Sequence, residues 1–131
     1  MVFPVMVADT SFLVPLFRRE DEHGQKAAET LVSMDETVLV PDTVLFETLT
    51  VLNRKCGFAI AKEAHGKLSE NPQISMMNFE ANEREAILNL FLSNAGKIST
   101  VDASVIYLSR KKGCKILSYD NDLNRAAAKR I

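Results

Sequence analysis

Four carboxylates lie at or near the starts of predicted helices. Asp9 and Asp120 each follow a short apolar run, whereas Glu47 and Asp102 lie in the first turns of predicted helices. Carboxylates that meet at one place repel each other, and a divalent cation relieves that repulsion. Because no His or Cys accompanies them, this set of oxygen ligands favours Mg²⁺ or Mn²⁺ over zinc.

Glu47 is the most informative of the four acids, because it shares a helix face with apolar residues. Val44 precedes it by three positions and Val51 follows it by four, which places the three side chains on one stripe. A carboxylate on a core-facing stripe costs free energy unless it is paired or bound to a metal. The alternative is that the side chain extends past its apolar neighbours into solvent.

The other three acids each have a structural alternative that the sequence leaves open. Asp9 suits the N-cap of the helix after it, and Ser99-x-x-Asp102 nearly matches a capping box. Asp120 or Asp122 suits an Asx turn or a helix cap. Each alternative explains one residue, whereas a metal site explains why the acids gather near one edge of the fold.

Short apolar runs alternate with helical patterns along the chain, without a linker, repeat or low-complexity segment. We expect strands over residues 5–8, 38–40, 74–77 and 114–118. We expect helices over residues 12–17, 24–34, 42–55, 59–69, 80–94, 100–112 and 122–129. This alternation predicts an α/β fold whose parallel sheet is covered by helices on both faces. Ligands bind at the edge where the strands end, which is where the acids are expected.

Composition sets broad limits on the protein. Its 131 residues suit a single domain, residues 1–131, and 16 basic against 17 acidic residues give a net charge of −1. This balance argues against a polybasic nucleic-acid binder. The two cysteines form no zinc or disulfide motif, and no glycine motif for nucleotides is present. Without a secretory signal or a membrane-length apolar run, we expect a soluble, cytoplasmic protein with no membrane partner.

Four segments resemble the acidic motifs of PIN-domain nucleases, in the order in which that family has them. Residues 7–11 (Val-Ala-Asp-Thr-Ser) are similar to its opening strand and acidic turn, and residues 45–52 to the helix that carries the second acid. Residues 101–106 resemble its third motif, and residues 116–123 resemble its fourth. The size of the chain is similar to that of the VapC-type toxins within the family.

The resemblance implies a PIN-like three-layer fold and a metal-dependent ribonuclease site. Its acids would be Asp9, Glu47, Asp102 and Asp120, holding Mg²⁺ or Mn²⁺. The residues that would support them are Thr10, Ser11, Ser118 and Asp122, with Asp122 as the alternative ligand to Asp120. The sheet would have four strands, or five if a short strand follows the last helix near residues 130–131.

The resemblance also implies partners and leaves alternative functions open. VapC-type toxins typically form homodimers and are bound by a small antitoxin, so we expect an RNA substrate, an antitoxin and a homodimer. Part of such a surface is expected around Phe46, Leu49 and Leu52, for which core packing is an equal explanation. One alternative is an RNA-processing PIN nuclease without an antitoxin. The other is a catalytically silent PIN module that binds RNA or protein.

The basic and aromatic residues give weaker indications. Arg54 and Lys55 end a helix that follows a strand, so we expect them far from the acids. Better candidates for contacts with RNA phosphates are Arg18, Arg19 and Arg125. His23 and His65 have no partner at a recognisable spacing and are expected to be ordinary surface residues. Phe12 and Tyr119 lie near the acids and suit either packing or stacking on a base.

Overall fold

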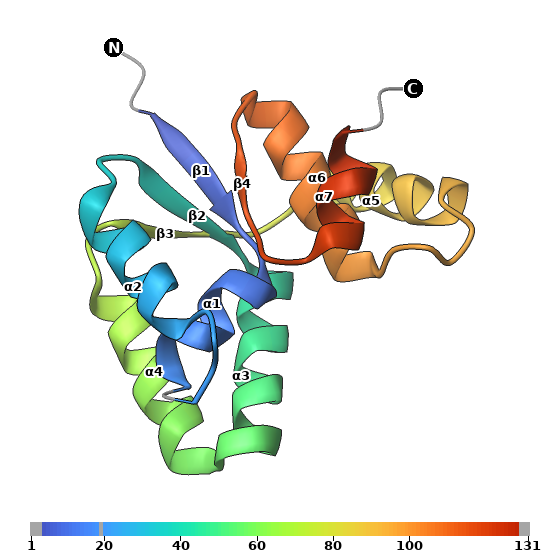
Figure 1. Cartoon of the computed structure of the whole chain (residues 1–131). Coiled ribbons are helices and arrows are strands. Elements are labelled where there is room, and N and C mark those ends of the chain that lie inside the picture. The colour runs from blue at the N-terminus through green and yellow to red at the C-terminus, as the bar shows by residue number, and fades with distance from the viewer. Residues whose placement is uncertain (1–3, 19, 129–131) are drawn as a thin grey trace.

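The computed structural model describes residues 4–18 and 20–128 and contains one four-stranded parallel sheet (Figure 1). The strands are β1 (Val5–Ala8), β2 (Thr37–Pro41), β3 (Ile74–Met77) and β4 (Ile116–Leu117), in the spatial order β3-β2-β1-β4. The helices are α1 (Thr10–Phe17), α2 (Gly24–Ser33), α3 (Asp42–Cys56), α4 (Phe58–Glu70), α5 (Ala81–Ser93), α6 (Thr100–Lys112) and α7 (Asn121–Ala128). The expected α/β class with a parallel sheet is therefore confirmed.

The strand order places the ends of β1 and β4 next to each other. The chain adds β2 and β3 on one side of β1 and then returns to add β4 on the other side. Because parallel crossovers are right-handed, the connection through α1 and α2 and the connection through α5 and α6 lie on opposite sides of the sheet. The reversal of strand order between β1 and β4 is the place where open α/β sheets bind ligands.

Apolar side chains from both layers of helices bury the sheet. Val7, Val38 and Val40 are fully buried in the strands, and Ala27 of α2 and Ile106 of α6 belong to the same cluster. Strands covered on both faces are near-continuous apolar runs, as β1 and most of β2 are. The main core therefore fixes the carboxyl end of β1, which Asp9 directly follows.

A second, smaller core lies beyond the sheet. Its buried members are Val14, Leu52, Ala61 and Ala64, from α1, α3 and α4. Figure 1 shows α3 and α4 as an antiparallel pair that extends past the ends of the strands, with α1 beside them. Beyond the strand ends these three helices pack on one another and not on the sheet. This second core supports α3 as it extends outward from the sheet edge.

The element boundaries agree closely with expectation except at the fourth strand. Strand β4 covers two residues, where the sequence predicts residues 114–118. Cys114 N–H still donates to the Ser109 carbonyl at the end of α6, and Ser118 turns toward the neighbouring Asp9. The alternative fifth strand and the last residue of the final predicted helix lie outside the described residues. None of the described helices has the length and apolar character needed to span a membrane.

Candidate active site

The four predicted acids line one open pocket of about 350 Å³ at the carboxyl edge of the sheet. Each comes from a different element: Asp9 follows β1, Glu47 lies on α3, Asp102 on α6, and Asp120 between β4 and α7. Residues up to 111 positions apart in the sequence thus meet at one place. The prediction that the acids converge on one edge agrees with this geometry.

Asp9 is the most enclosed of the four acids. Its side chain is 3% exposed, and its Oδ2 accepts hydrogen bonds from Ser11 N–H at 3.3 Å and Ser11 Oγ at 2.8 Å. Ser118 Oγ donates to the same oxygen at 3.1 Å. Asp9 is therefore the N-cap of α1, as the structural alternative held, and it is also a buried carboxylate in the pocket wall.

Ser11 and Ser118 tie the two strand ends together around Asp9. Their hydroxyl oxygens are 3.0 Å apart, and the Asp9 backbone N–H donates to the Leu117 carbonyl at 3.0 Å. Ser118 Oγ also accepts the Asp120 backbone N–H at 3.0 Å. Both serines therefore hold the Asp9 side chain, and Ser118 also holds the backbone of Asp120. These contacts agree with the supporting role expected for the two hydroxyls.

Asp102 lies in the first turn of α6 and completes its capping box. Asp102 Oδ2 accepts the Ser99 N–H at 3.0 Å, and Ser99 Oγ accepts the Asp102 N–H at 3.0 Å. A hydrogen bond of 2.6 Å between the hydroxyls of Thr43 and Ser104 joins the starts of α3 and α6. Glu47 lies on α3 and Asp102 on α6, so this bond helps to fix the position of one acid relative to the other.

Asp120 and Asp122 are distinguished by their surroundings. Asp120 lines the pocket, and its Oδ1 accepts the backbone N–H groups of Asp122 at 2.9 Å and Leu123 at 3.1 Å at the start of α7. Asp122 is exposed, pairs with Arg125 and is not part of the pocket wall. The geometry therefore brings Asp120, and not Asp122, to the other acids.

Burial shifts the protonation of two of the acids. Desolvation raises the pKa of Asp9, and the hydrogen bonds from Ser11 and Ser118 only partly offset it. Desolvation also raises the pKa of Asp102, and the negative charges of Asp9 and Asp120 raise it further. The pocket thus raises the free energy of the ionised carboxylates, and a cation bound there would lower it.

The donor set suits a hard divalent cation. All four acids and the neighbouring hydroxyls offer oxygen, and Thr10 Oγ1, in the pocket wall, has no hydrogen-bond partner among the described residues. In residues 4–18 and 20–128, however, no three acidic, His or Cys side chains are spaced to hold an ion as they stand. Asp102 and Asp120 are turned toward the helix starts that they cap. These contacts use Asp102 Oδ2 and Asp120 Oδ1, so they do not prevent either carboxylate from reaching an ion, directly or through water.

Lys55 corrects one expectation from the sequence. It lines the same pocket as the acids, although it was expected far from them. The expectation was wrong because α3 extends outward from the sheet edge, so Glu47, Val51 and Lys55 face the pocket at intervals of four residues. That spacing was visible in the sequence, but the direction of α3 was not.

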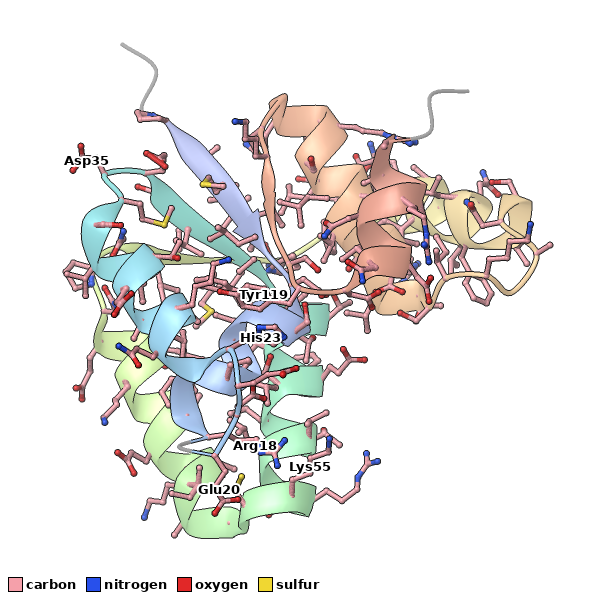
Figure 2. All side chains as sticks on the ribbon, viewed as in Figure 1. Arg18, Glu20, His23, Asp35, Lys55 and Tyr119 are labelled. Carbon is pink, nitrogen blue, oxygen red and sulfur yellow. The ribbon has the colours of Figure 1, made fainter. Side chains whose placement is uncertain are left out.

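Among the other basic residues predicted to contact RNA, the structure places only some in the pocket. Arg18 lines the pocket and pairs with Asp21 at 3.9 Å, whereas Arg125 is exposed and pairs with Asp122. Arg19 lies outside the described residues. His23 also lines the pocket, against the expectation of an ordinary surface residue. Figure 2 shows Arg18, His23 and Lys55 on the side of the molecule where α1, α3 and the segment before α2 meet.

The apolar residues expected at a partner surface face different ways. Phe46 is 63% exposed on α3, Leu49 is partly buried, and Leu52 is fully buried in the second core. Core packing therefore accounts for Leu52. Phe46 remains available to a partner, as does Phe58, which is 71% exposed at the start of α4.

Comparison with known proteins covers nearly the whole chain. The family model of the PIN domain matches residues 6–129. The 23S rRNA-specific endonuclease VapC20 of Mycobacterium tuberculosis is 30% identical over 124 residues, which is 93% of this chain and 94% of that protein. The crystal structure of the same relative, described as a Sarcin-Ricin loop cleaving toxin, has a TM-score of 0.82 and 27% identity. That match covers 92% of this chain and 94% of that one.

More distant structures share the fold. VapBC2 from Rickettsia felis, bound to a DNA fragment from its promoter, has a TM-score of 0.68 and 12% identity over 93% of this chain and 92% of that one. FitAcB from Neisseria gonorrhoeae has a TM-score of 0.67 and 15% identity over 93% of this chain and 92% of that one. The same arrangement of strands and helices thus recurs in chains of very different sequence.

Proposed function

The chain belongs to the PIN domain family, and we propose that it is an endoribonuclease toxin whose active site is the four-acid pocket. The family match and the 30% identity to a toxin endonuclease confirm the expected family, fold and enzyme class. The observation that carries the site assignment is that Asp9, Glu47, Asp102 and Asp120 come from four elements and line one pocket.

PIN nucleases generally depend on divalent metal ions, and for this chain we propose Mg²⁺ or Mn²⁺. Asp9 and Asp102 would hold the ion, with Asp120 and Glu47 completing the site directly or through water. A bound ion lowers the pKa of a coordinated water to give the nucleophile and stabilises charge on the phosphate oxygens.

The chain's own residues prepare this site. Ser11 and Ser118 fix Asp9 by donating hydrogen bonds to Oδ2. Lys55 and Arg18 in the pocket wall would attract the phosphates of the RNA. No carboxylate of the described residues lies within ion-pair distance of Lys55, so its ammonium is available to a substrate.

RNA is the substrate class, and 23S rRNA is the first substrate to test because the relative with 30% identity is named for it. The role of a toxin implies a small antitoxin as partner, and we propose a homodimer in the cytoplasm, where the RNA is. Exposed Phe46 and Phe58 support a protein partner at α3 and α4. Light scattering on the purified parent tests the dimer, and a monomeric protein contradicts it.

The two alternative functions predict different behaviour. An RNA-processing PIN nuclease without an antitoxin would cleave RNA without stopping growth when it is expressed in bacteria. A catalytically silent module would bind RNA or protein without cutting it. The retention of four acids around one pocket supports an active enzyme, because a binding module has no need of a cluster of carboxylates that repel each other.

The direct test is cleavage of RNA in Mn²⁺ by the parent and by Asp9→Asn and Asp102→Asn. We expect the parent to cut and EDTA to stop it, because the acids act through a bound cation. Each variant should lose at least about a hundredfold in rate, since a ligand to the ion is lost. Equal, EDTA-resistant cleavage by all three proteins would refute the proposed site.

Asp35→Asn is the matched control for these variants. It removes the same charge at an exposed position before β2, far from the pocket, as the label in Figure 2 shows. Its cleavage rate should equal that of the parent. A loss as large as that of Asp9→Asn would mean that net charge, and not the pocket, governs the activity.

A further inference from the structure

Three rings form a stack that runs from the core to the pocket. Phe12 is 2% exposed, and its ring centroid is 6.1 Å from that of Tyr119 at an interplanar angle of 27°. Tyr119 in turn stacks on His23, with centroids 4.3 Å apart and planes inclined by only 8°. His23 is the outermost ring, and its side chain is 41% exposed. The stack thus ends on a partly exposed imidazole in the pocket wall, whose Nε2 lies 3.4 Å from Glu22 Oε1.

The inner part of this stack is tied to the acids. Tyr119 lies between Ser118 and Asp120, and its backbone N–H donates to Ser11 Oγ at 2.9 Å. The same hydroxyl donates to Asp9 Oδ2 at 2.8 Å. Because one serine holds both the tyrosine and the buried carboxylate, the rings are fixed relative to the proposed reaction site.

The outer ring is also held in place from its own side. His23 N–H donates to Asp21 Oδ1 at 2.9 Å, and Asp21 pairs with Arg18 at the end of α1. Gly24, the next residue, packs so closely on α1 that an added Cβ would lie 3.0 Å from the Pro15 carbonyl oxygen. The segment before α2 is therefore seated on α1, and the imidazole needs little further ordering to bind a ligand.

The stack lies in the wall of the pocket that contains the proposed reaction site. His23 and Tyr119 line the same pocket as the four acids and the cations Arg18 and Lys55. Figure 2 shows Tyr119 and His23 next to each other, with Arg18 and Lys55 farther along the same side of the molecule. Aromatic side chains with an open face beside a cationic groove are typical of sites that bind single-stranded nucleic acid.

We propose that His23, backed by Tyr119 and Phe12, is the platform on which a base of the RNA substrate stacks beside the cleaved phosphate. The inference rests on the proposed function only in taking single-stranded RNA as the ligand. Stacking on a ring is tolerant of base identity, so the platform positions the strand and contributes affinity more than sequence choice.

The test measures binding of a short labelled single-stranded RNA by fluorescence anisotropy, with Ca²⁺ in place of Mn²⁺. His23→Ala should bind roughly five- to thirtyfold more weakly than the parent, because one base–ring contact is lost. His23→Phe should bind within about twofold of the parent, since the ring is kept. His65→Ala is the matched control, because it removes the other histidine at an exposed position on α4 outside this pocket.

A second series replaces each nucleotide of the RNA in turn by an abasic one. One abasic position should weaken binding by the parent as much as His23→Ala does. On that RNA the parent and His23→Ala should bind equally. Equal binding of the intact RNA by the parent and His23→Ala would overturn the proposal. So would a loss that is the same for every abasic RNA, since it would report on folding or on phosphate contacts.

Cleavage in Mn²⁺ separates this proposal from the proposed function. We expect His23→Ala to raise KM more than it lowers kcat, because stacking holds the substrate and performs no chemistry. Cleavage that is normal in His23→Ala would overturn the platform and leave the nuclease intact. A parent that binds RNA through His23 but cuts none would refute the nuclease and retain the platform. A parent that shows no RNA binding overturns the platform.

Discussion

The Asp9 side chain is subject to two opposing influences on its charge. Three hydrogen bonds to Oδ2 stabilise the carboxylate, while burial disfavours it, and burial is the larger effect because the pKa of Asp9 is raised. A raised pKa means that the folded protein holds this proton more tightly than the unfolded chain does. The charged form therefore destabilises the folded protein at pH values above that pKa.

We predict that Asp9→Asn stabilises the protein in EDTA. At neutral pH its Tm should exceed that of the parent by a few degrees, because the amide keeps the buried hydrogen bonds and removes the buried charge. The difference should shrink as pH falls toward the ordinary Asp pKa of 3.8, where the parent's carboxyl is protonated. Thermal melts between these pH values measure it, with Asp35→Asn as the control. A lower Tm in Asp9→Asn would show that the charge stabilises the fold.

At the scale of the elements, helix α6 combines a structural and a proposed functional role in one turn. Its capping box uses Ser99 and Asp102, and the following turns supply buried Ala103, Val105 and Ile106 to the core. The helix start is therefore coupled to the stability of the whole molecule. The residue that completes the cap is also the acid that faces Asp9 and Asp120.

We predict that Ser99→Ala lowers the free energy of unfolding by about 1 kcal/mol, because the Asp102 N–H loses its cap. Chemical denaturation measures this change. Ser93→Ala is the control, because that hydroxyl is exposed and bonds only within α5. Metal binding, measured by calorimetry, should stay within about threefold of the parent because Asp102 is retained. A stability equal to that of the parent would contradict the role of the cap.

Helices α5 and α6 are joined by a polar contact around Glu83. Glu83 Oε2 accepts hydrogen bonds from Lys111 Nζ at 2.8 Å and Tyr107 Oη at 3.1 Å. The hydrogen bond from Lys111 is the main reason that the pKa of Glu83 is lowered. A lowered pKa gives stability that is present above the usual Glu pKa of 4.5 and is lost as pH falls through the lowered value.

We predict that Glu83→Gln lowers the Tm by several degrees at neutral pH, because Lys111 and Tyr107 lose their shared acceptor charge. The difference between variant and parent should disappear in strong acid, where Glu83 is protonated. Glu85→Gln, at an exposed position on the same helix, should melt like the parent. Melts that are equal for all three proteins would mean that the contact adds nothing.

At the scale of the whole molecule, the pocket unites the ends of strands with the sides of helices from distant parts of the chain. Burial is the main reason that the pKa of Asp102 is raised, and the negative charges of Asp9 and Asp120 raise it further. The two cores of the fold hold the acids together despite both costs. A cation that binds the folded protein alone therefore stabilises it, by an amount that grows with the logarithm of the ion concentration once that concentration exceeds the Kd.

We predict that Mn²⁺ raises the Tm of the parent, because the proposed ion site consists of four acids that only the folded chain brings together. At an ion concentration about 100 times the Kd, the gain is about 2.7 kcal/mol, or several degrees. Asp9→Asn should show a much smaller rise. Differential scanning calorimetry with and without EDTA measures both. A rise that is equal in parent and variant would place the ion elsewhere on the protein.

Much of the fold and the identity of the acids could be predicted from the sequence because their signals are local. Short apolar runs predict the four strands. Ser99 and Asp102, three positions apart, form a capping-box pattern that indicates the start of α6. Asp9, Glu47, Asp102 and Asp120 were identified from motifs of a few residues each. Their roles as ligands, and the assignment of residues 1–131 to a single domain, stay predictions.

What the sequence determined by itself was the class of fold and the set of acids, since both depend on patterns within one turn or strand. Only the tertiary structure decided that Lys55 and His23 share the pocket and that Asp122 does not. The direction of α3 depends on a second core between α1, α3 and α4. The position of His23 depends on the close packing of Gly24 on α1 and on the ring of Tyr119, which is 96 positions away. Contacts of that kind depend on which segments pack together, and no local spacing in the chain encodes them.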